Sequence, residues 1–334
     1  MEMSLSRERY EEIVGDFSKR TFLTLGDLMA DEYLHGSVRR ISPESPVVIV
    51  EVQSEERKPG GAANVANNLR ALGARVLLAG LVGEDEAGRD LLAALNQQGI
   101  STSLTLIDPS RPTTLKTRVI AQRQQVVRVD RESTHAPSDL IVAALLENVQ
   151  RSLPDVDGVL ISDYRKGTIT HHLASEIAAV CSRLNIPLIA NPKPESALWF
   201  EGAAALSLNQ SEAEALIGYL PTEAAALADC GAALRARLGV DMLVITLGPR
   251  GLAYWRADGE YRHVPAHTIE VFDVAGAGDS AIAALALALV GSATPMEAAQ
   301  VANHAGACAV RKLGVATVSA EELLADWSPN GKQS

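Results

Sequence analysis

Strand-like and helix-like segments alternate along nearly the whole chain of 334 residues. The strand-like runs are short and rich in Val, Ile and Leu, and they fall at residues 21–25, 76–81, 158–161, 187–190, 203–208 and 242–246. The helix-like runs are rich in Ala and Leu, and they fall at residues 62–72, 87–97, 170–184, 211–219, 222–238 and 281–290. Because no polar linker interrupts it, this alternation predicts one domain over residues 1–334, an α/β fold with a doubly wound, mostly parallel sheet and helices on both faces.

Two strand-rich segments break the alternation. One is Val47–Val52, which follows the basic stretch Arg39–Pro43; the other is a pair of runs at 114–120 and 125–129 joined by a polar turn. Neither has a helix beside it, and exposed strand edges are normally paired or covered. We therefore expect a small β lid standing off the main sheet, formed by excursions at about residues 33–58 and 112–130.

The composition limits the classes of partner. A formal charge of −11 disfavours nucleic acid and anionic membranes, although it leaves anionic small molecules open. The three cysteines are scattered and form no C-x-x-C pair, as is usual in a reducing cytosol. The first 20 residues carry no apolar signal core, and the longest uncharged stretch, Ser280–Met296, is too short in its apolar part to span a bilayer. We expect a cytoplasmic protein that binds neither nucleic acid nor membrane.

A glycine-rich turn, Asp273–Ser280, carries the strongest functional signal. It lies between a β-like run at 267–272 and the apolar helix at 281–290. Glycines at such a junction let backbone N–H groups surround an anion at a helix N-terminus. Asp279 is poorly suited to binding phosphate itself but well suited to removing a proton from an attacking hydroxyl, which favours phosphoryl transfer.

The same turn has two competing interpretations. It fits a relaxed dinucleotide fingerprint, but Asp279 would repel a pyrophosphate and no acidic strand end follows about 20 residues later. Pro295-Met296-Glu297 stands there instead and is typical of the start of another helix. A simple glycine turn without function is the second interpretation.

A second motif, Pro59–Leu69, opens the first helix of the main sheet. By itself it is a turn followed by a helix-surface Asn64. In this order, however, the two motifs resemble the paired signatures of the ribokinase-like carbohydrate kinases, the pfkB family. The resemblance implies that Gly60, Gly61 and Asn64 bind the sugar. It also implies that Asp279 is the catalytic base and that the backbone of Gly276, Ala277 and Gly278 forms the anion hole.

The resemblance assigns further residues between and beyond these motifs. It implies that Asp27 accepts a sugar hydroxyl and that Asn209 and Glu212, in an N-x-x-E motif, position Mg²⁺ through water. ATP would contact the turn containing Thr246, Gly248 and Gly251 and the helix carrying Asn303, with Lys193 facing the phosphates. A K⁺ site near the catalytic turn rests on the resemblance alone.

Several stretches resemble one branch of the family, the kinases of D-glycero-β-D-manno-heptose 7-phosphate. These are residues 37–46, 60–67, 162–167 and 311–319. The implied reaction makes heptose 1,7-bisphosphate for the ADP-heptose branch of lipopolysaccharide core synthesis. In many bacteria this kinase is fused to an adenylyltransferase with an H-x-G-H motif; none occurs here, so the chain looks like a kinase-only form. It departs from the branch at Ala275, where Thr is usual, and at Asn191, where Asp is usual.

The substrate 7-phosphate would need cations. The candidates on the lid are Arg39, Arg40, Lys116, Arg118, Arg123 and Arg128, each of which is otherwise a solvated charge on an exposed strand. Asp163 and Lys166 follow a strand end, where α/β proteins place ligand sites, and are candidates on the substrate side. Members with such inserts form homodimers through the lid, and the resemblance implies the same here.

Two further functions remain compatible with the sequence. The chain could phosphorylate another sugar or sugar phosphate, or could be a non-catalytic sugar- or nucleotide-binding regulator on the same fold. His263 and His267 lack a third metal ligand nearby in the sequence, so no zinc site is predicted there, and His304 is expected to be a surface or packing residue.

Overall fold

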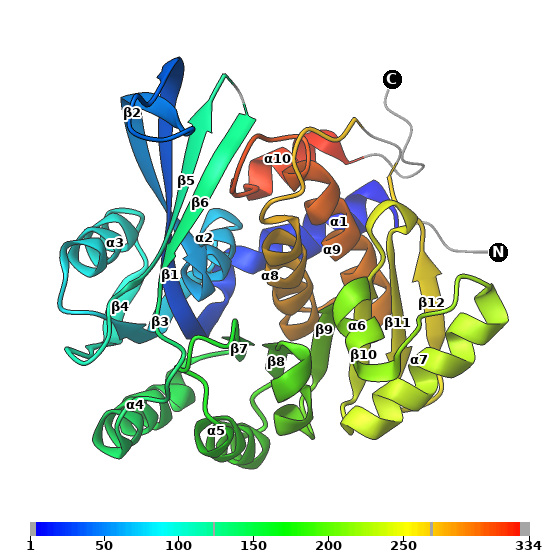
Figure 1. Cartoon of the computed structure of the whole chain (residues 1–334). Coiled ribbons are helices and arrows are strands. Elements are labelled where there is room, and N and C mark those ends of the chain that lie inside the picture. The colour runs from blue at the N-terminus through cyan, green and yellow to red at the C-terminus, as the bar shows by residue number, and fades with distance from the viewer. Residues whose placement is uncertain (1–4, 123, 268–269, 328–334) are drawn as a thin grey trace.

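A computed structural model describes residues 5–122, 124–267 and 270–327 of the chain. Its centre is a twisted sheet in the order β12-β11-β10-β9-β8-β7-β1-β3-β4 (Figure 1). Strands β10 through β4 on this path run parallel, and only β11 and β12 are antiparallel to their neighbours. The strands are β1 Thr21–Ile41, β3 Arg75–Val82, β4 Ser101–Ile107, β7 Gly158–Ser162, β8 Leu188–Asn191, β9 Ala205–Asn209, β10 Met242–Thr246, β11 Leu252–Arg256 and β12 Tyr261–Val264.

Helices cover both faces of this sheet, and each face has its own apolar core. One core is contributed by α1 Arg7–Asp16, α2 Ala62–Ala71, α3 Glu86–Gln97, α8 Ala277–Val290, α9 Pro295–Ala309 and α10 Ala320–Asp326. The other is contributed by α4 Asp139–Ser152, α5 His171–Leu184, α6 Gln210–Ile217 and α7 Ala224–Leu238. Short 3-10 helices lie at Phe17–Lys19, Leu153–Asp155, Pro194–Phe200 and Gly248–Arg250. The predicted doubly wound α/β fold is confirmed.

The lid is a second sheet that shares one strand with the first. The outer half of β1 pairs antiparallel with β2 (Val48–Gly61) and parallel with β5 (Thr114–Ala121), and β5 pairs antiparallel with β6 (Gln124–Arg131). Figure 1 shows these strands rising from the main sheet beside α2. The first strand was expected over residues 21–25, and this length is wrong: it continues to Ile41, because its outer half pairs with β2 and β5.

Two further predictions around the glycine-rich turn need correction. The described residues of the β-like run 267–272 are not in a strand, and residues 268 and 269 lie outside the described part. The apolar helix begins at Ala277 rather than Ala281, so Asp279 belongs to its first turn. The helix expected at Pro295 is confirmed as α9. The sequence predicts disorder only in the last few residues, from about Ser328, and these lie outside the described part of the chain.

In the described part of the chain, no helix combines the length and apolar character needed to cross a bilayer.

Candidate active site

Asp279 stands in the first turn of α8, beyond a sharp change of backbone direction. Gly276, the residue before the helix, has a φ of 77°, a left-handed conformation that favours glycine. A Cβ there would also lie 3.4 Å from the side-chain amide of Asn64. The glycine therefore lets the helix start close against α2, and the Asn64 side chain reaches the glycine-rich turn.

The carboxylate of Asp279 accepts a hydrogen bond on each oxygen. Asn64 Nδ2 donates to Oδ2 at 2.6 Å, and the Tyr164 hydroxyl donates to Oδ1 at 2.8 Å. Burial raises the pKa of Asp279, and the two hydrogen bonds oppose that rise only in part. A carboxylate with a raised pKa is a stronger proton acceptor, as a general base requires.

Two of the three N–H groups expected to form the anion hole are available in this conformation. The N–H of Ala275 donates to the Asp273 carboxylate at 3.0 Å, and that of Ala277 donates to Val274 O at 3.3 Å. Among the hydrogen bonds of the described residues, none engages the N–H of Gly276 or Gly278. These two groups, at the positive end of α8, are the donors open to an anion.

A cavity of about 630 Å³ lies beside the N-terminus of α8, a volume in the range of small-molecule sites. Ala277 and Gly278 form the end of its wall nearest the catalytic turn. The wall also contains four residues predicted for the nucleotide: Thr246, Gly248, Gly251 and Asn303. The amide of Asn303 donates to Pro265 O at 2.9 Å, so that in this structure it holds the cavity wall together.

The N-x-x-E motif forms the N-terminus of α6. Asn209 Oδ1 accepts from the N–H of Glu212 at 2.9 Å, and Glu212 Oε2 accepts from the N–H of Asn209 at 2.8 Å, which is a capping box. The other oxygen of Glu212 accepts from Lys193 Nζ at 2.6 Å. A carboxylate and an amide oxygen suit Mg²⁺, but because both Glu212 oxygens are already engaged, these residues fit the ion only through water.

Lys193 connects this motif to Asp279. Its ammonium group lies 5.1 Å from the centre of the Tyr164 ring, a cation–π contact, and Tyr164 donates to Asp279. Lys193 thus links Glu212 to Tyr164 and, through it, to Asp279, while Asn209 is paired in the sheet with Thr246 of the cavity wall.

Asp27 lies beneath the loop that follows β7, at residues 163–168. It is almost fully buried, and its carboxylate accepts from the N–H groups of Tyr164, Lys166 and Thr168 at 2.8 to 3.0 Å. Arg111 holds the same loop from the other side by donating to Lys166 O at 3.1 Å. A direct contact of Asp27 with a sugar hydroxyl stays a prediction; in this structure its role is to hold the loop that carries Tyr164.

Asp163 points inward. Its carboxylate accepts from the Ser196 hydroxyl and, at 2.7 Å, from the N–H of Arg165. Burial raises its pKa to about 6, and the negative charge of Asp27 adds to the rise. Arg165 has a φ of 59°, which is strained for a residue with a side chain, and its guanidinium stacks on Trp199. The contacts of Asp163 therefore stabilise the loop, and its predicted place on the substrate side stays a prediction.

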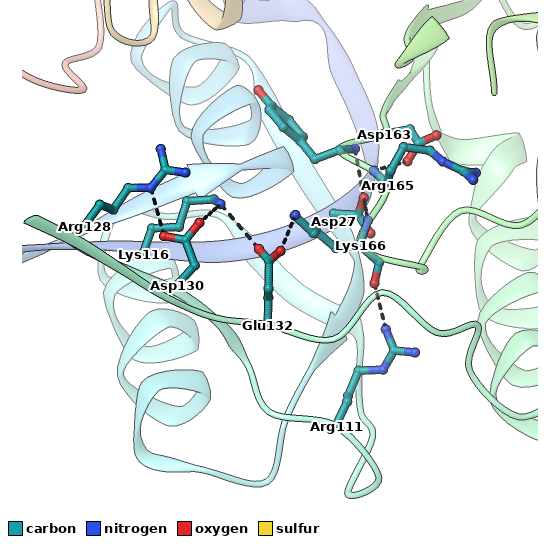
Figure 2. A network of polar contacts seen from close by, with 10 residues as sticks. Asp27, Arg111, Lys116, Arg128, Asp130, Glu132, Asp163, Arg165 and Lys166 are labelled. Carbon is teal, nitrogen blue, oxygen red and sulfur yellow. Dashed lines mark hydrogen bonds and ion pairs between the residues drawn. The ribbon is translucent and has the colours of Figure 1, made fainter. Parts of the chain in front are cut away.

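The lid cations form a network with acidic neighbours (Figure 2). Arg128 pairs with Asp130 at 2.9 Å, Lys116 with Asp130 and Glu132 at 3.2 and 3.4 Å, and Lys166 with Glu132 at 2.8 Å. Arg118 pairs with Asp31 outside this network. The cationic hairpin expected from the sequence is therefore largely neutralised, because Asp130 and Glu132 on and after β6 face the same cations. Among these five side chains, three cations against two carboxylates leave one net positive charge.

The remaining predicted residues are spread more widely. Gly60 and Gly61 lie at the junction of β2 and α2, where a Cβ on Gly60 would collide with the Asp31 carboxylate. Arg39 pairs with Glu51, and Arg40 is exposed at the outer part of β1. Arg123 lies outside the described residues.

Sequence reasoning missed three residues that the structure brings to the site: Tyr164, Asp31 and Arg111. Tyr164 stands within the quoted segment 162–167, but its role depends on β7 being the neighbour of β1, which no local pattern reveals. Asn191, the other departure from the heptose-kinase branch, donates to Ser207 O at 3.1 Å and so joins β8 to β9.

Comparison with known proteins identifies the family of the chain. Residues 23–322 match the pfkB family of carbohydrate kinases. A curated relative named bifunctional protein HldE from Trichlorobacter lovleyi is 42% identical over 99% of this chain and 67% of its own length. The HldE proteins of Geobacter metallireducens and Azorhizobium caulinodans are 41% and 44% identical over 96% and 90% of the chain. The chain thus spans about two thirds of the length of the curated relatives it matches.

Solved structures agree on the fold. Phosphofructokinase-2 from Escherichia coli in complex with potassium has a TM-score of 0.74 at 18% identity, covering 91% of this chain and 96% of the other. Ribokinase from Arabidopsis thaliana, complexed with ribose and ATP, has a TM-score of 0.70 at 20% identity, covering 92% and 99%. Together with the arrangement around Asp279, the family match over residues 23–322 shows that the chain belongs to the pfkB family of carbohydrate kinases and is a sugar kinase.

Proposed function

We propose that this kinase transfers the γ-phosphoryl group of ATP to the anomeric hydroxyl of D-glycero-D-manno-heptose 7-phosphate, giving heptose 1,7-bisphosphate. The observation that carries the phosphoryl-transfer chemistry is the position of Asp279. It has a raised pKa, lies in the first turn of α8 and is one residue from a free N–H on the wall of the cavity. The choice of sugar is supported by the segments that resemble the heptose-phosphate branch.

Each side chain and backbone group near Asp279 has a separate role in this reaction. Asp279 takes the proton of the attacking hydroxyl as the oxygen approaches the γ-phosphorus. The N–H groups of Gly276 and Gly278 donate to the oxygens of the transferring group, where negative charge is spread in the transition state. Asn64 and Tyr164 fix the carboxylate, and the sugar hydroxyl replaces one of these two donors when it binds.

ATP occupies the cavity lined by the turn at Thr246–Gly251 and by α9, with its phosphates directed toward α8. Mg²⁺ would be held through water by Asn209 and Glu212 and, when bound, would neutralise charge on the phosphates. A K⁺ requirement is a further part of this proposal, and comparing turnover in potassium and sodium salts measures it.

The 7-phosphate is proposed to bind at the network of Lys116, Arg128 and Lys166. The loop 163–168 supports this placement, since it carries Lys166 two residues after Tyr164 and so joins the network to the base. A dianionic phosphate would compete with Asp130 and Glu132 for these cations. Charge-assisted contacts remote from the reacting oxygen hold the sugar in line with ATP, and such binding energy appears in turnover as well as in affinity.

The Asp279→Asn variant tests the base. Loss of a general base typically lowers kcat by about 10²- to 10⁴-fold, and we expect ATP and sugar affinity to stay close to wild type, because amide and carboxylate have the same shape. Turnover and calorimetric binding of both substrates are measured on the same samples. Near-wild-type turnover would show that Asp279 is not the base.

A substrate panel tests the sugar. Under equal conditions heptose 7-phosphate should give the highest kcat/KM, ahead of free heptose and fructose 6-phosphate, with ³¹P NMR identifying a 1-phosphate product. Ribose and a keto-deoxy sugar acid complete the panel as substrates of other members of the family. Equal efficiency on free heptose or fructose 6-phosphate would overturn the heptose-phosphate assignment and leave the sugar-kinase conclusion standing.

A further inference from the structure

Three side chains with metal-binding atoms meet where α9 and α10 cross, outside the site described above. His304 and Cys308 lie one turn apart on α9, and Asp326 ends α10. Figure 1 shows α10 packed beside α9, with α1 passing behind them. His304 is almost completely buried and Cys308 nearly so, whereas Asp326 keeps a path to solvent with 24% of its side chain exposed.

The three ligand atoms face one another. His304 Nε2 lies 3.1 Å from Asp326 Oδ2, and Cys308 Sγ lies 3.6 Å from each of these atoms. In a tetrahedral zinc site with ordinary bond lengths, the edges between ligand atoms are about 3.4 Å for nitrogen to oxygen and about 3.6 Å for sulfur to nitrogen or oxygen. The triangle formed by the three atoms therefore has nearly the size of one face of such a tetrahedron.

The second polar atom of two of these side chains is held from outside. Tyr10 on α1 contacts His304 Nδ1 with its hydroxyl oxygen at 2.6 Å, which leaves Nε2 toward Cys308 and Asp326. Arg311 donates to Asp326 Oδ1 at 2.5 Å, which leaves Oδ2 toward the same point. Metal-binding histidines and carboxylates are commonly oriented by partners of this kind on their far side.

We propose that His304 Nε2, Cys308 Sγ and Asp326 Oδ2 bind a zinc ion, with water in the fourth position. A thiolate and an imidazole select zinc over magnesium or calcium, which take oxygen ligands. Binding releases the thiol proton of Cys308 to solvent as the zinc–sulfur bond forms. The ion would join α9 to α10 behind the nucleotide cavity, since Asn303 and Ala307 on the same helix line that cavity.

Cobalt(II) is the direct probe of this site. Protein freed of metal with a chelator is titrated with Co²⁺, which gives a near-ultraviolet thiolate-to-cobalt absorption only if sulfur is a ligand, together with the strong visible bands of four-coordinate Co²⁺. We expect one Co²⁺ per chain and displacement of the bands by one equivalent of Zn²⁺. The absence of a thiolate band in the wild-type chain would overturn the proposal and leave the three side chains as a hydrogen-bonded cluster only.

Matched variants identify the ligands. Cys308→Ser should abolish the thiolate band, whereas Cys181→Ser, a buried free thiol on α5, should leave it unchanged. Asp326→Asn, at the partly exposed end of α10, should weaken Co²⁺ binding by about tenfold or more and serves if the buried variants do not fold. Retention of the band in Cys308→Ser, or its loss in Cys181→Ser, would refute the assignment.

Thermal unfolding gives an independent readout. One equivalent of Zn²⁺ should raise the Tm of the chelator-treated wild type, because an ion that binds only the folded chain stabilises it, and should leave the Tm of Cys308→Ser unchanged. An equal rise in both proteins would place the zinc elsewhere.

Discussion

Around Asp279, two neutral donors each bind one oxygen of the carboxylate, and both lower its pKa against the effect of burial. The Tyr164 hydroxyl donates to the Asp279 carboxylate, and the N–H of Tyr164 donates to Asp27. Lys193 lies over the ring of Tyr164. Burial raises the pKa of Tyr164 itself, so that it stays protonated and acts as a donor rather than as a second base. We regard it as a positioning residue for the base.

The Tyr164→Phe variant follows from this contact. Its hydroxyl lowers the pKa of Asp279, so its removal raises that pKa, and the acidic limb of the kcat/KM profile should move to higher pH. A lost hydrogen bond to a charged group is worth about 1.5–3 kcal/mol, which corresponds to a fall in turnover of roughly ten- to a hundredfold at neutral pH. Steady-state kinetics across the pH range measure both effects.

Tyr219→Phe is the control for this variant, because Tyr219 is an exposed tyrosine outside the site. If Tyr164→Phe lowers activity without moving the acidic limb, its hydroxyl does not act through Asp279.

Residues with a local motif were predictable, and residues placed by sheet order were not. Asn64 and Asp279 stand in two motifs far apart in the sequence that together resemble the family's signatures, and the structure places Asn64 Nδ2 2.6 Å from Asp279 Oδ2. Tyr164 and Arg111 escaped notice because their roles follow from which strands are neighbours. The charges on the lid were misjudged for a related reason: Asp130 and Glu132 pair with Lys116 only once β5 and β6 are in register.

Among the elements, α6 begins with a motif that has two roles, one in capping the helix and one proposed in binding Mg²⁺. Asn209 and Glu212 cap the helix, and the same two residues are proposed to hold Mg²⁺ through water. The N-terminus of α9 offers a matched case, since Thr294 and Glu297 form a capping box there and Glu297 also pairs with a basic residue, Arg9 at 2.9 Å.

Replacing Glu212 by Gln separates the capping role from the proposed role in binding Mg²⁺. Glutamine can still close a capping box, so the Tm should stay near that of wild type, whereas loss of the carboxylate should raise the Mg²⁺ concentration for half-maximal activity roughly tenfold. Titration of turnover with Mg²⁺ at saturating substrates gives the value. Glu297→Gln should leave the Mg²⁺ response unchanged, and equal responses in the two variants would remove Glu212 from the metal site.

Most elements of the main sheet could be predicted because hydrophobic runs and turns mark them locally. The length of β1 could not, because its outer half is stabilised by pairing with β2 and β5 rather than by its own apolar pattern. The strand expected at residues 267–272 was predicted wrongly for the opposite reason: its local pattern suits a strand, but it has no partner strand among the described residues. Val271 and Phe272 have high strand propensity, but they are exposed and no strand pairs with them among the described residues.

At the scale of the whole molecule, the lid has two unlike faces. Residues directly opposite in a sheet share a face, so the pairs Val119–Val127 and Thr117–Val129 lie on one side, and Arg118–Arg128 and Lys116–Asp130 lie on the other. The polar side includes Arg118, which pairs with Asp31, whose charge also raises the pKa of Asp279. On the apolar side, Val127 and Val129 are 47% and 57% exposed.

The exposed valines on this side of the lid favour a partner, and we expect a second copy of the chain to cover them. The wild type should sediment as a dimer at micromolar concentration. The double substitution Val127→Lys and Val129→Lys should give a monomer, because it places charges on that face. Leu140→Lys, at an exposed apolar residue on α4, should stay dimeric. A wild-type monomer would contradict the proposed dimer.

The continuity of β1 has a consequence for how such kinases diversify. Asp27 and Asp31 occupy the same strand, one beneath the loop of the main sheet and the other against the lid. β1 belongs to both sheets, with no loop between its two halves. Recombination therefore cannot exchange the lid without also replacing part of the main sheet. A new lid would require replacement of β1 as well, and therefore of Asp27, which holds the loop that carries Tyr164. Changes of substrate in this architecture should therefore accumulate as single substitutions on the lid's polar face, while the strand that carries them is inherited whole.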